Sequence, residues 1–450
     1  AKKDFGSGPQ LAHFTQVCIP HITHGKDPNI CILIRRLTYR FDQVLFVLAG
    51  LGLGLRQRHD FGALCPCHCV KCKKGDVQAE KKKACMFCQL AQRPLPQTTI
   101  MLPDMDALEA SLLNTSGTVK LDVRFRTLFT LKGIAALSEE KRLRVIDIIS
   151  RALNDDSALL KHELAYVLGQ IKDTRALPRL EEVLSDEKEH AMVRHEAAEA
   201  MGAISSPSAL PVLQKYLHDD DISIRETCHL AIHKIELDNS EAGRREQALR
   251  ELREKEHGDA LSAARAAAAP IDPAPATVRV AGTKDTDQNV YTLENVPKFR
   301  EALLDRSLSL FERYRAMFAL RNTVQQGGEA AQSPAIQALI EALCDDSALF
   351  KHEICFVFGE LCHPASIQAM ARVLNDDREH EMVRHEAAEA LGAILEEGCE
   401  PNESESDKVI QILRRFAFDE SAPRVVRESC VVALDEIAYN QDPTQFQRVE

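Results

Sequence analysis

A stretch of 50 residues that occurs twice constrains this chain more than any other feature. Residues 155–204 and 345–394 align without a gap at an offset of 190, and 27 of the 50 paired residues are identical. None of the 12 pairs across 171–182 and 361–372 match, whereas KHE and MVRHEAAEA are unchanged between the copies. A segment that only had to bury an apolar face would not keep these polar residues while its neighbours diverged.

The retained polar residues form four His-Glu pairs, two in each copy and 33 residues apart: His162-Glu163, His195-Glu196, His352-Glu353 and His385-Glu386. Neighbouring residues on a helix point about 100° apart, so a His and the next Glu should not face each other. The two His of one copy occupy the same place in consecutive units and should converge. If the two copies face each other, each Glu can reach an ion held mainly by the other copy.

Metal binding is our main interpretation of these pairs, and we expect all eight residues to form one site. Four imidazoles and up to four carboxylates exceed what one tetrahedral zinc takes. They suit two ions that prefer octahedral coordination with open positions, as in oxygen-activating di-iron carboxylate sites. A non-catalytic adaptor that binds a basic peptide without metal, and a different metalloenzyme such as a hydrolase, stay open as alternatives.

Two further acids and two further His accompany the pairs. Glu199 and Glu389 stand four residues beyond a His and share its helical face. They are supporting acids, substrate-binding groups for a cation, or members of exposed salt bridges. His190 and His380 precede the motif where a helix start is expected, so we interpret them as non-ligands.

Regular helical periodicity begins near residue 105, and we expect the first two helices at 106–116 and 123–136. Four segments align in the first half (FRTLFTLKGI, HELAYVLGQI, HEAAEAMGAI and RETCHLAIHKI) at spacings of roughly 31 to 37 residues. This period predicts an all-α solenoid of two-helix repeats, each burying its apolar face against the next. Glycine recurs inside the motif helices at 169, 202, 359 and 392, where close packing of a neighbouring backbone is expected.

The predicted organisation has four parts: an N-terminal extension (1–104), a first repeat half (105–236), a linker (237–293) and a second repeat half (294–450). The linker contains an Ala/Pro-rich stretch typical of a loop. Of the formal net charge of −12, residues 1–100 contribute +9 and the remaining residues −21. The acidic repeats favour a basic partner and disfavour nucleic acid.

The first 100 residues lack the repeat pattern. They contain eight of the 14 Cys, and four of these have the spacing of a structural zinc site: Cys69, Cys72, Cys85 and Cys88. The alternative is a poorly ordered extension without metal. A 12-residue apolar run at 44–55 is too short to span a bilayer, so no membrane segment is expected. The scattered Cys of the repeats favour a reducing compartment.

The four motif segments LLKHELAYVLGQ, MVRHEAAEAMGAI, LFKHEICFVFGE and MVRHEAAEALGAI closely resemble the deoxyhypusine hydroxylase family. The similarity runs through nearly all of residues 105–450. It implies a HEAT-repeat fold with two pseudo-symmetric halves of four repeats facing a shared metal site, and it gives no information on residues 1–100.

The resemblance also implies a reaction, namely the O2-dependent hydroxylation of deoxyhypusine on the hypusine-containing translation initiation factor. Two Fe(2+) ions would be bound by the four motif His, with Glu163 and Glu353 as carboxylate ligands. Glu196 and Glu386 would be ligands or contacts to the substrate amine. A cytoplasmic monomer without a nucleic-acid or membrane partner is expected.

Overall fold

The computed structural model describes residues 104–248, 269–277, 290–396 and 403–441. Every regular element within these ranges is a helix, which confirms the predicted all-α class. No helix in these ranges is both long and apolar enough to cross a membrane. The four Cys of the predicted zinc site lie outside the described residues.

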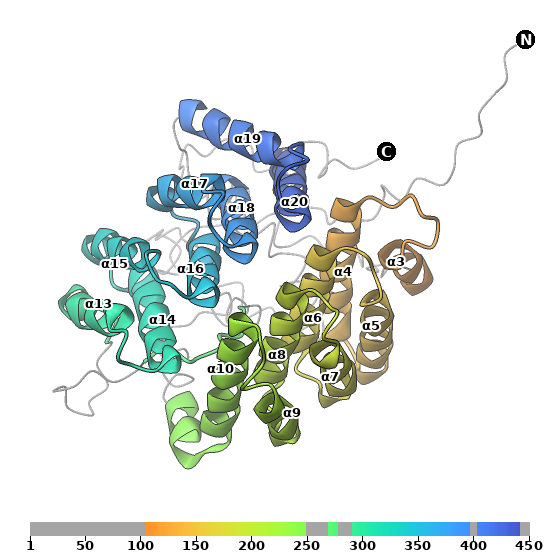
Figure 1. Ribbon diagram of the computed structural model, residues 1–450, viewed down its shortest axis with the longest axis horizontal. Helices are drawn as coiled ribbons and strands as arrows, with labels where there is room; N and C mark the ends of the chain where they lie inside the picture. Colours follow the sequence, from red (N-terminus) through yellow and green to blue (C-terminus); the bar gives the residue numbers. More distant parts are fainter. Residues whose placement is uncertain (1–103, 249–268, 278–289, 397–402, 442–450) are drawn as a thin grey trace, which may run out of the picture.

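The first half is a stack of antiparallel helix pairs. Its helices are α3 (Met105–Leu112), α4 (Leu121–Ala135), α5 (Glu139–Ala152), α6 (Ala158–Ile171), α7 (Leu177–Ser185), α8 (Ala191–Ile204), α9 (Leu210–Lys215) and α10 (Ile222–Asn239). Helices α4, α6, α8 and α10 lie side by side on the inner face, and α5, α7 and α9 lie outside them (Figure 1).

The second half repeats this arrangement. Its helices are α13 (Val296–Leu304), α14 (Leu310–Gln326), α15 (Glu329–Ala342), α16 (Ala348–Leu361), α17 (Ile367–Asn375), α18 (Glu381–Glu396), α19 (Glu403–Ala417) and α20 (Arg424–Gln441). The inner face consists of α14, α16, α18 and α20. Both stacks bury a continuous apolar core of aliphatic and aromatic side chains between their inner and outer layers.

The inner faces of the two halves meet at both ends of the stacks. Helix α10 contacts α14 and α16, and α20 contacts α4 and α6 (Figure 1). The arrangement brings α6 and α8 of one half opposite α16 and α18 of the other. These four helices carry the His-Glu pairs.

The repeated DDSAL sequence explains where two of these helices begin. Ser157 Oγ accepts from the N–H of Leu160 at 3.1 Å and caps α6. The N–H of Ser157 donates in turn to the carboxylate of Asp155 at 2.9 Å. Ser347 caps α16 in the same way. These local bonds satisfy donors that the first turn of a helix leaves free, so the Asp-Asp-Ser triplet fixes the start of α6 and α16.

Close helix packing is confirmed at three of the four repeated glycines. A Cβ on Gly169 would lie 2.8 Å from Ala200 Cα, one on Gly202 3.0 Å from Ala231 Cα, and one on Gly392 2.9 Å from Ala433 Cβ. At Gly359 the nearest atom is Ala390 Cα at 3.5 Å, an ordinary contact. Three glycines therefore let neighbouring inner helices approach each other, and the fourth has more room.

The first predicted helix is shorter than its apolar pattern indicated. Helix α3 ends at Leu112, four residues before the expected end, because Asn114 turns the chain with a positive φ of 49°. The Asn114 side chain then accepts from the N–H of Val119 at 2.9 Å. The second predicted helix matches α4 to within two residues.

Candidate metal centre

The four His-Glu pairs come from four different inner helices and meet in one buried cluster. His162 and Glu163 lie on α6, and the pairs at 195, 352 and 385 lie on α8, α16 and α18. Each of the eight residues is 8% exposed or less, and His195 and His385 are fully buried. Because the repeats of one half stack on each other, its two His-Glu pairs lie side by side. The two halves face each other, and this brings the pairs of both halves together.

The imidazole rings are close both within a half and between halves. Within a half, the ring centroids of His162 and His195 are 5.4 Å apart, and those of His352 and His385 are 5.2 Å apart. Between halves, the ring of His162 lies 5.3 Å from that of His385. No single half thus contains the whole cluster.

Carboxylates surround the rings. His162 Nε2 lies 3.2 Å from Glu196 Oε2, and His352 Nε2 lies 3.3 Å from Glu386 Oε2. His162 Nδ1 also contacts Glu163 Oε1 at 3.3 Å. The expectation that a His and the next Glu do not face each other is therefore wrong at this pair, because their side chains are long enough to meet.

Seven ring nitrogens of the four His are buried and have no hydrogen-bond partner: His162 Nε2 and both nitrogens of His195, His352 and His385. The short distance from His162 Nε2 to Glu196 lacks hydrogen-bond geometry. Buried polar atoms without partners are rare because each costs free energy. Nitrogen donors of three His lie close enough together to bind one ion, as do donors of His162, His195 and Glu196.

The electrostatic environment differs among the His. Burial opposes protonation of His162, but Glu196 and Glu163 outweigh burial and raise its pKa well above the ordinary value. Burial, followed by the nearby imidazoles of His162 and His352, lowers the pKa of His195 well below the ordinary value. Burial and the same two His lower the pKa of His385. Neutral imidazoles are the form that binds metal.

The acids around the cluster interact across the halves. Burial and then Glu199 raise the pKa of Glu353 well above its ordinary value, although the two residues belong to different halves. Burial, Glu386 and Glu163 likewise raise the pKa of Glu389. The repulsion among these carboxylates favours a cation at the centre.

Glu199 and Glu389 adjoin the cluster, and neither side chain lies in an exposed salt bridge. Both are partly buried, and the pKa of Glu199 is raised well above normal by burial and by Glu196. Glu389 Oε1 accepts from the Ser429 hydroxyl at 3.0 Å and lies 3.5 Å from His385 Nδ1. The sequence pattern did not single out Ser429, whose equivalent in the first half is Thr227.

His190 and His380 start helices, as the sequence predicts. His190 Nδ1 accepts from the N–H of Met192 and His380 Nδ1 from that of Met382, each at 3.2 Å. His190 Nε2 also reaches Glu381 Oε1 of the other half at 3.2 Å. Among the residues that the structure describes, neither His belongs to a group of side chains close enough to hold a metal ion.

Fold and site together define a class of protein: a two-helix-repeat solenoid that encloses a buried His-carboxylate cluster with the ligand set of a metalloenzyme. A family model described as HEAT repeats matches residues 145–233 and 336–435. Deoxyhypusine hydroxylase from Mycosarcoma maydis is 59% identical over 356 residues, which cover 77% of this chain and 98% of the relative.

Two other relatives have the same name. Deoxyhypusine hydroxylase from Cryptococcus neoformans is 43% identical over 76% of this chain and 87% of its own length. The structure of human deoxyhypusine hydroxylase in complex with glycerol is 41% identical, covers 74% of this chain and 96% of that one, and has a TM-score of 0.56. The chain belongs to the deoxyhypusine hydroxylase family and is an oxidoreductase.

Proposed function

We propose that the chain hydroxylates the deoxyhypusine side chain of the hypusine-containing translation initiation factor, using O2 and two Fe(2+) ions. The observation that carries this proposal is the group of seven unpartnered ring nitrogens in the buried cluster. Unpartnered nitrogens and repelling carboxylates together fit a site that binds divalent ions. Their mixed nitrogen and oxygen donors suit ferrous iron.

The ligands that we propose are the four His of the motif, with Glu163 and Glu353 as carboxylate ligands. Glu196 and Glu386 complete the set as ligands or as contacts to the substrate amine. When bound, ferrous iron with open positions supplies the redox chemistry that activates O2. The chain contributes imidazoles and carboxylates from both halves and a buried site that restricts access of water.

The substrate fits the charge of the repeats. Deoxyhypusine is a long aliphatic side chain with amines, and residues 101–450 have a formal balance of −21. A negative net charge attracts such a cationic chain. Every cysteine in the described ranges is a free thiol, which supports a reducing compartment such as the cytosol. The adaptor alternative is disfavoured, since the His-Glu pairs are buried and cannot serve as an open peptide-binding surface.

The test is mass spectrometry of the deoxyhypusine-bearing factor after incubation with the protein, Fe(2+), a reductant and isotopically labelled O2. The proposal predicts the gain of one labelled oxygen atom on the modified lysine. His195→Ala is the matched control and should abolish the gain. An unchanged substrate mass, or an oxygen atom derived from water, would overturn the proposal.

A further inference from the structure

A series of polar contacts links the starts of the helices that carry the His-Glu pairs. In the first half, Lys161 Nζ donates to Glu189 Oε2 at 2.6 Å. The other oxygen of Glu189 accepts from the N–H of His190 at 2.7 Å. His190 Nδ1 in turn caps α8 by accepting from the N–H of Met192. The lysine beside the first motif His is thus bonded to the residues that start the helix of the second.

The second half repeats these contacts at the offset of 190. Lys351 Nζ donates to both carboxylate oxygens of Glu379, at 2.6 and 2.8 Å. Glu379 accepts from the N–H of His380 at 2.8 Å, and His380 caps α18. The side chains of both Lys-Glu pairs are only 13–16% exposed. Ion pairs shielded from water in this way are weakened less by solvent than surface pairs are.

A contact between the halves joins the two series. His190 Nε2 lies 3.2 Å from Oε1 of Glu381, the first residue of α18. Glu381 directly follows His380, so the contacts reach all four helices, α6, α8, α18 and α16. The counterpart of Glu381 in the first half is Ala191, whose side chain cannot make the reciprocal contact. We call this set of residues the start network: Lys161, Glu189, His190, Lys351, Glu379, His380 and Glu381.

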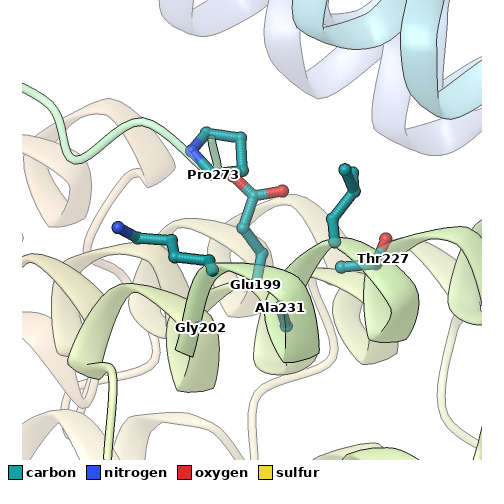
Figure 2. A pocket seen from close by; sticks show the side chains of 7 residues that line it. Glu199, Gly202, Thr227, Ala231 and Pro273 are labelled. Atoms are coloured by element: carbon teal, nitrogen blue, oxygen red, sulfur yellow. The ribbon is translucent and has the colours of Figure 1, made fainter. Parts of the chain in front are cut away.

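The linker contacts the inner helices nearer their other ends. Figure 2 shows the Glu199 side chain rising from α8 toward Pro273 of the linker. The Asp272 carboxylate accepts two hydrogen bonds from the Arg321 guanidinium of α14, at 2.6 and 2.8 Å. The inner helices are therefore held by different contacts at their two ends, the start network at one and the linker at the other.

The spacing of the motif His agrees with the start network better than with the packing farther along the helices. A Cβ at Gly169 would lie 2.8 Å from Ala200 Cα, whereas one at the equivalent Gly359 would lie 3.5 Å from Ala390 Cα. The helix pairs of the two halves thus approach each other differently at that point. The shortest Lys-Glu distance is nonetheless 2.6 Å in both halves, and the imidazole centroids are 5.4 and 5.2 Å apart.

Resting on the function proposed above, we infer that Lys161 and Lys351 are positioning residues for the metal centre. Each lysine fixes how far α8 or α18 is displaced along the axis of the neighbouring helix. It thereby fixes the height of the second motif His of that half relative to the first. The contact between His190 and Glu381 does the same for one half against the other. Imidazoles that are placed before an ion arrives lose less conformational freedom when it binds, which strengthens binding.

Lys161→Met tests the inference, because methionine removes the ammonium and keeps an aliphatic side chain of similar length. The full chain is titrated with Co(2+), in competition with a chelator, and the visible absorption bands of the bound ion are recorded. Lys161→Met should raise the Kd for Co(2+) by about tenfold and shift these bands, which depend on the geometry of the ligands. Lys161→Arg can still donate to Glu189 and should restore both.

Lys234→Met is the matched control. Lys234 donates to Asp238 at 2.9 Å within α10, a helix without a motif His, so this ion pair fixes no offset between helices. Its loss should leave the Kd and the bands unchanged. Unchanged Kd and bands in Lys161→Met, or an equal change in Lys234→Met, would overturn the inference. If Lys161→Met does not fold, Glu189→Gln should give the same result, and unchanged bands would again overturn the inference.

The contact between the halves has its own matched pair, His190→Asn and His380→Asn. Asparagine also caps helices, so both variants keep the helix starts, and its shorter side chain does not reach Glu381. Only His190→Asn should weaken Co(2+) binding, and equal effects would contradict a role for the contact with Glu381. An unaltered protein that binds no Co(2+) would overturn the inference. Hydroxylation of the factor is measured separately, so its absence alone would overturn the proposed function and not the inference.

Discussion

The hydroxyl of Ser157 donates a hydrogen bond to Glu428 Oε2 at 2.7 Å, from the start of α6 in the first half to the last helix of the second. The hydroxyl of Ser347 makes the equivalent bond to Glu226 at 2.7 Å. Both serines also cap the helices that carry the first His of each half. The residues that start these helices therefore also connect the two halves.

Removing one of these connections should destabilise the assembled protein. Glu428→Ala removes the acceptor and leaves the cap of α6 intact, because Leu160 still donates to Ser157. We expect the free energy of unfolding in urea to fall by about 1–3 kcal/mol. Glu420→Ala, at an exposed position, is the control and should change it by less than about 0.5 kcal/mol. An equal effect of both variants would contradict this account of the interface.

The repeated glycines allow a paired test of packing. A Cβ at Gly169 would lie 2.8 Å from the Ala200 backbone, so Gly169→Ala should cost about 1–3 kcal/mol of stability. Gly359→Ala meets Ala390 only at 3.5 Å and should be neutral or stabilising by up to about 1 kcal/mol. Thermal unfolding measures the stability of both variants. A Gly359→Ala variant that is less stable than Gly169→Ala would contradict the helix spacing described above.

The cysteines of the inner helices should be chemically inert. Burial raises the pKa of Cys228 and of Cys430 to about 12, so almost no thiolate is present near neutral pH. Cys344 is exposed. Alkylation followed by peptide mapping should label Cys344 in the native protein and should label Cys228 and Cys430 only after unfolding. Rapid native labelling of Cys228 would contradict the packing of α10.

The contact between His190 and Glu381 predicts a pH effect at low pH. His190 lowers the pKa of Glu381, so the ionised form is favoured in the folded state. The resulting stabilisation is present above the unfolded pKa of about 4.3 and is lost as pH falls through the lower folded value. Both side chains are about one-third exposed, so Glu381→Gln should cost less than about 1 kcal/mol near pH 6. A cost that persists undiminished at about pH 3 would contradict this assignment.

The convergence of the His residues was predictable because it depends on the repeat period alone. The two His of one half occupy equivalent positions in consecutive stacked repeats, so their side chains lie close together. This does not depend on the position of the other half. The bond between His162 and Glu163 was not predictable, because it depends on the conformations of two side chains in a buried cluster. The wider space at Gly359 likewise reflects the spacing of α16 and α18 rather than any local pattern.

The contacts between the two halves could not be predicted from the sequence for another reason. Ser157 and Glu428 are 271 residues apart, and Ser347 and Glu226 are 121 apart, so no local spacing links them. Residues 269–277 of the linker have an Ala/Pro composition typical of a loop, and nothing in their sequence indicates that Asp272 pairs with Arg321. Tertiary contacts of this kind follow from the closure of the two stacks and not from periodicity.

The central claim is that both halves supply ligands to two metal ions, and elemental analysis of the purified protein tests it most directly. Protein produced with ample iron should contain about two iron ions per chain. His162→Ala in the first half and His352→Ala in the second should each lower this content while the helical circular dichroism stays unchanged. Protein that purifies without metal or with zinc alone, or variants that keep the full iron content, would contradict the claim.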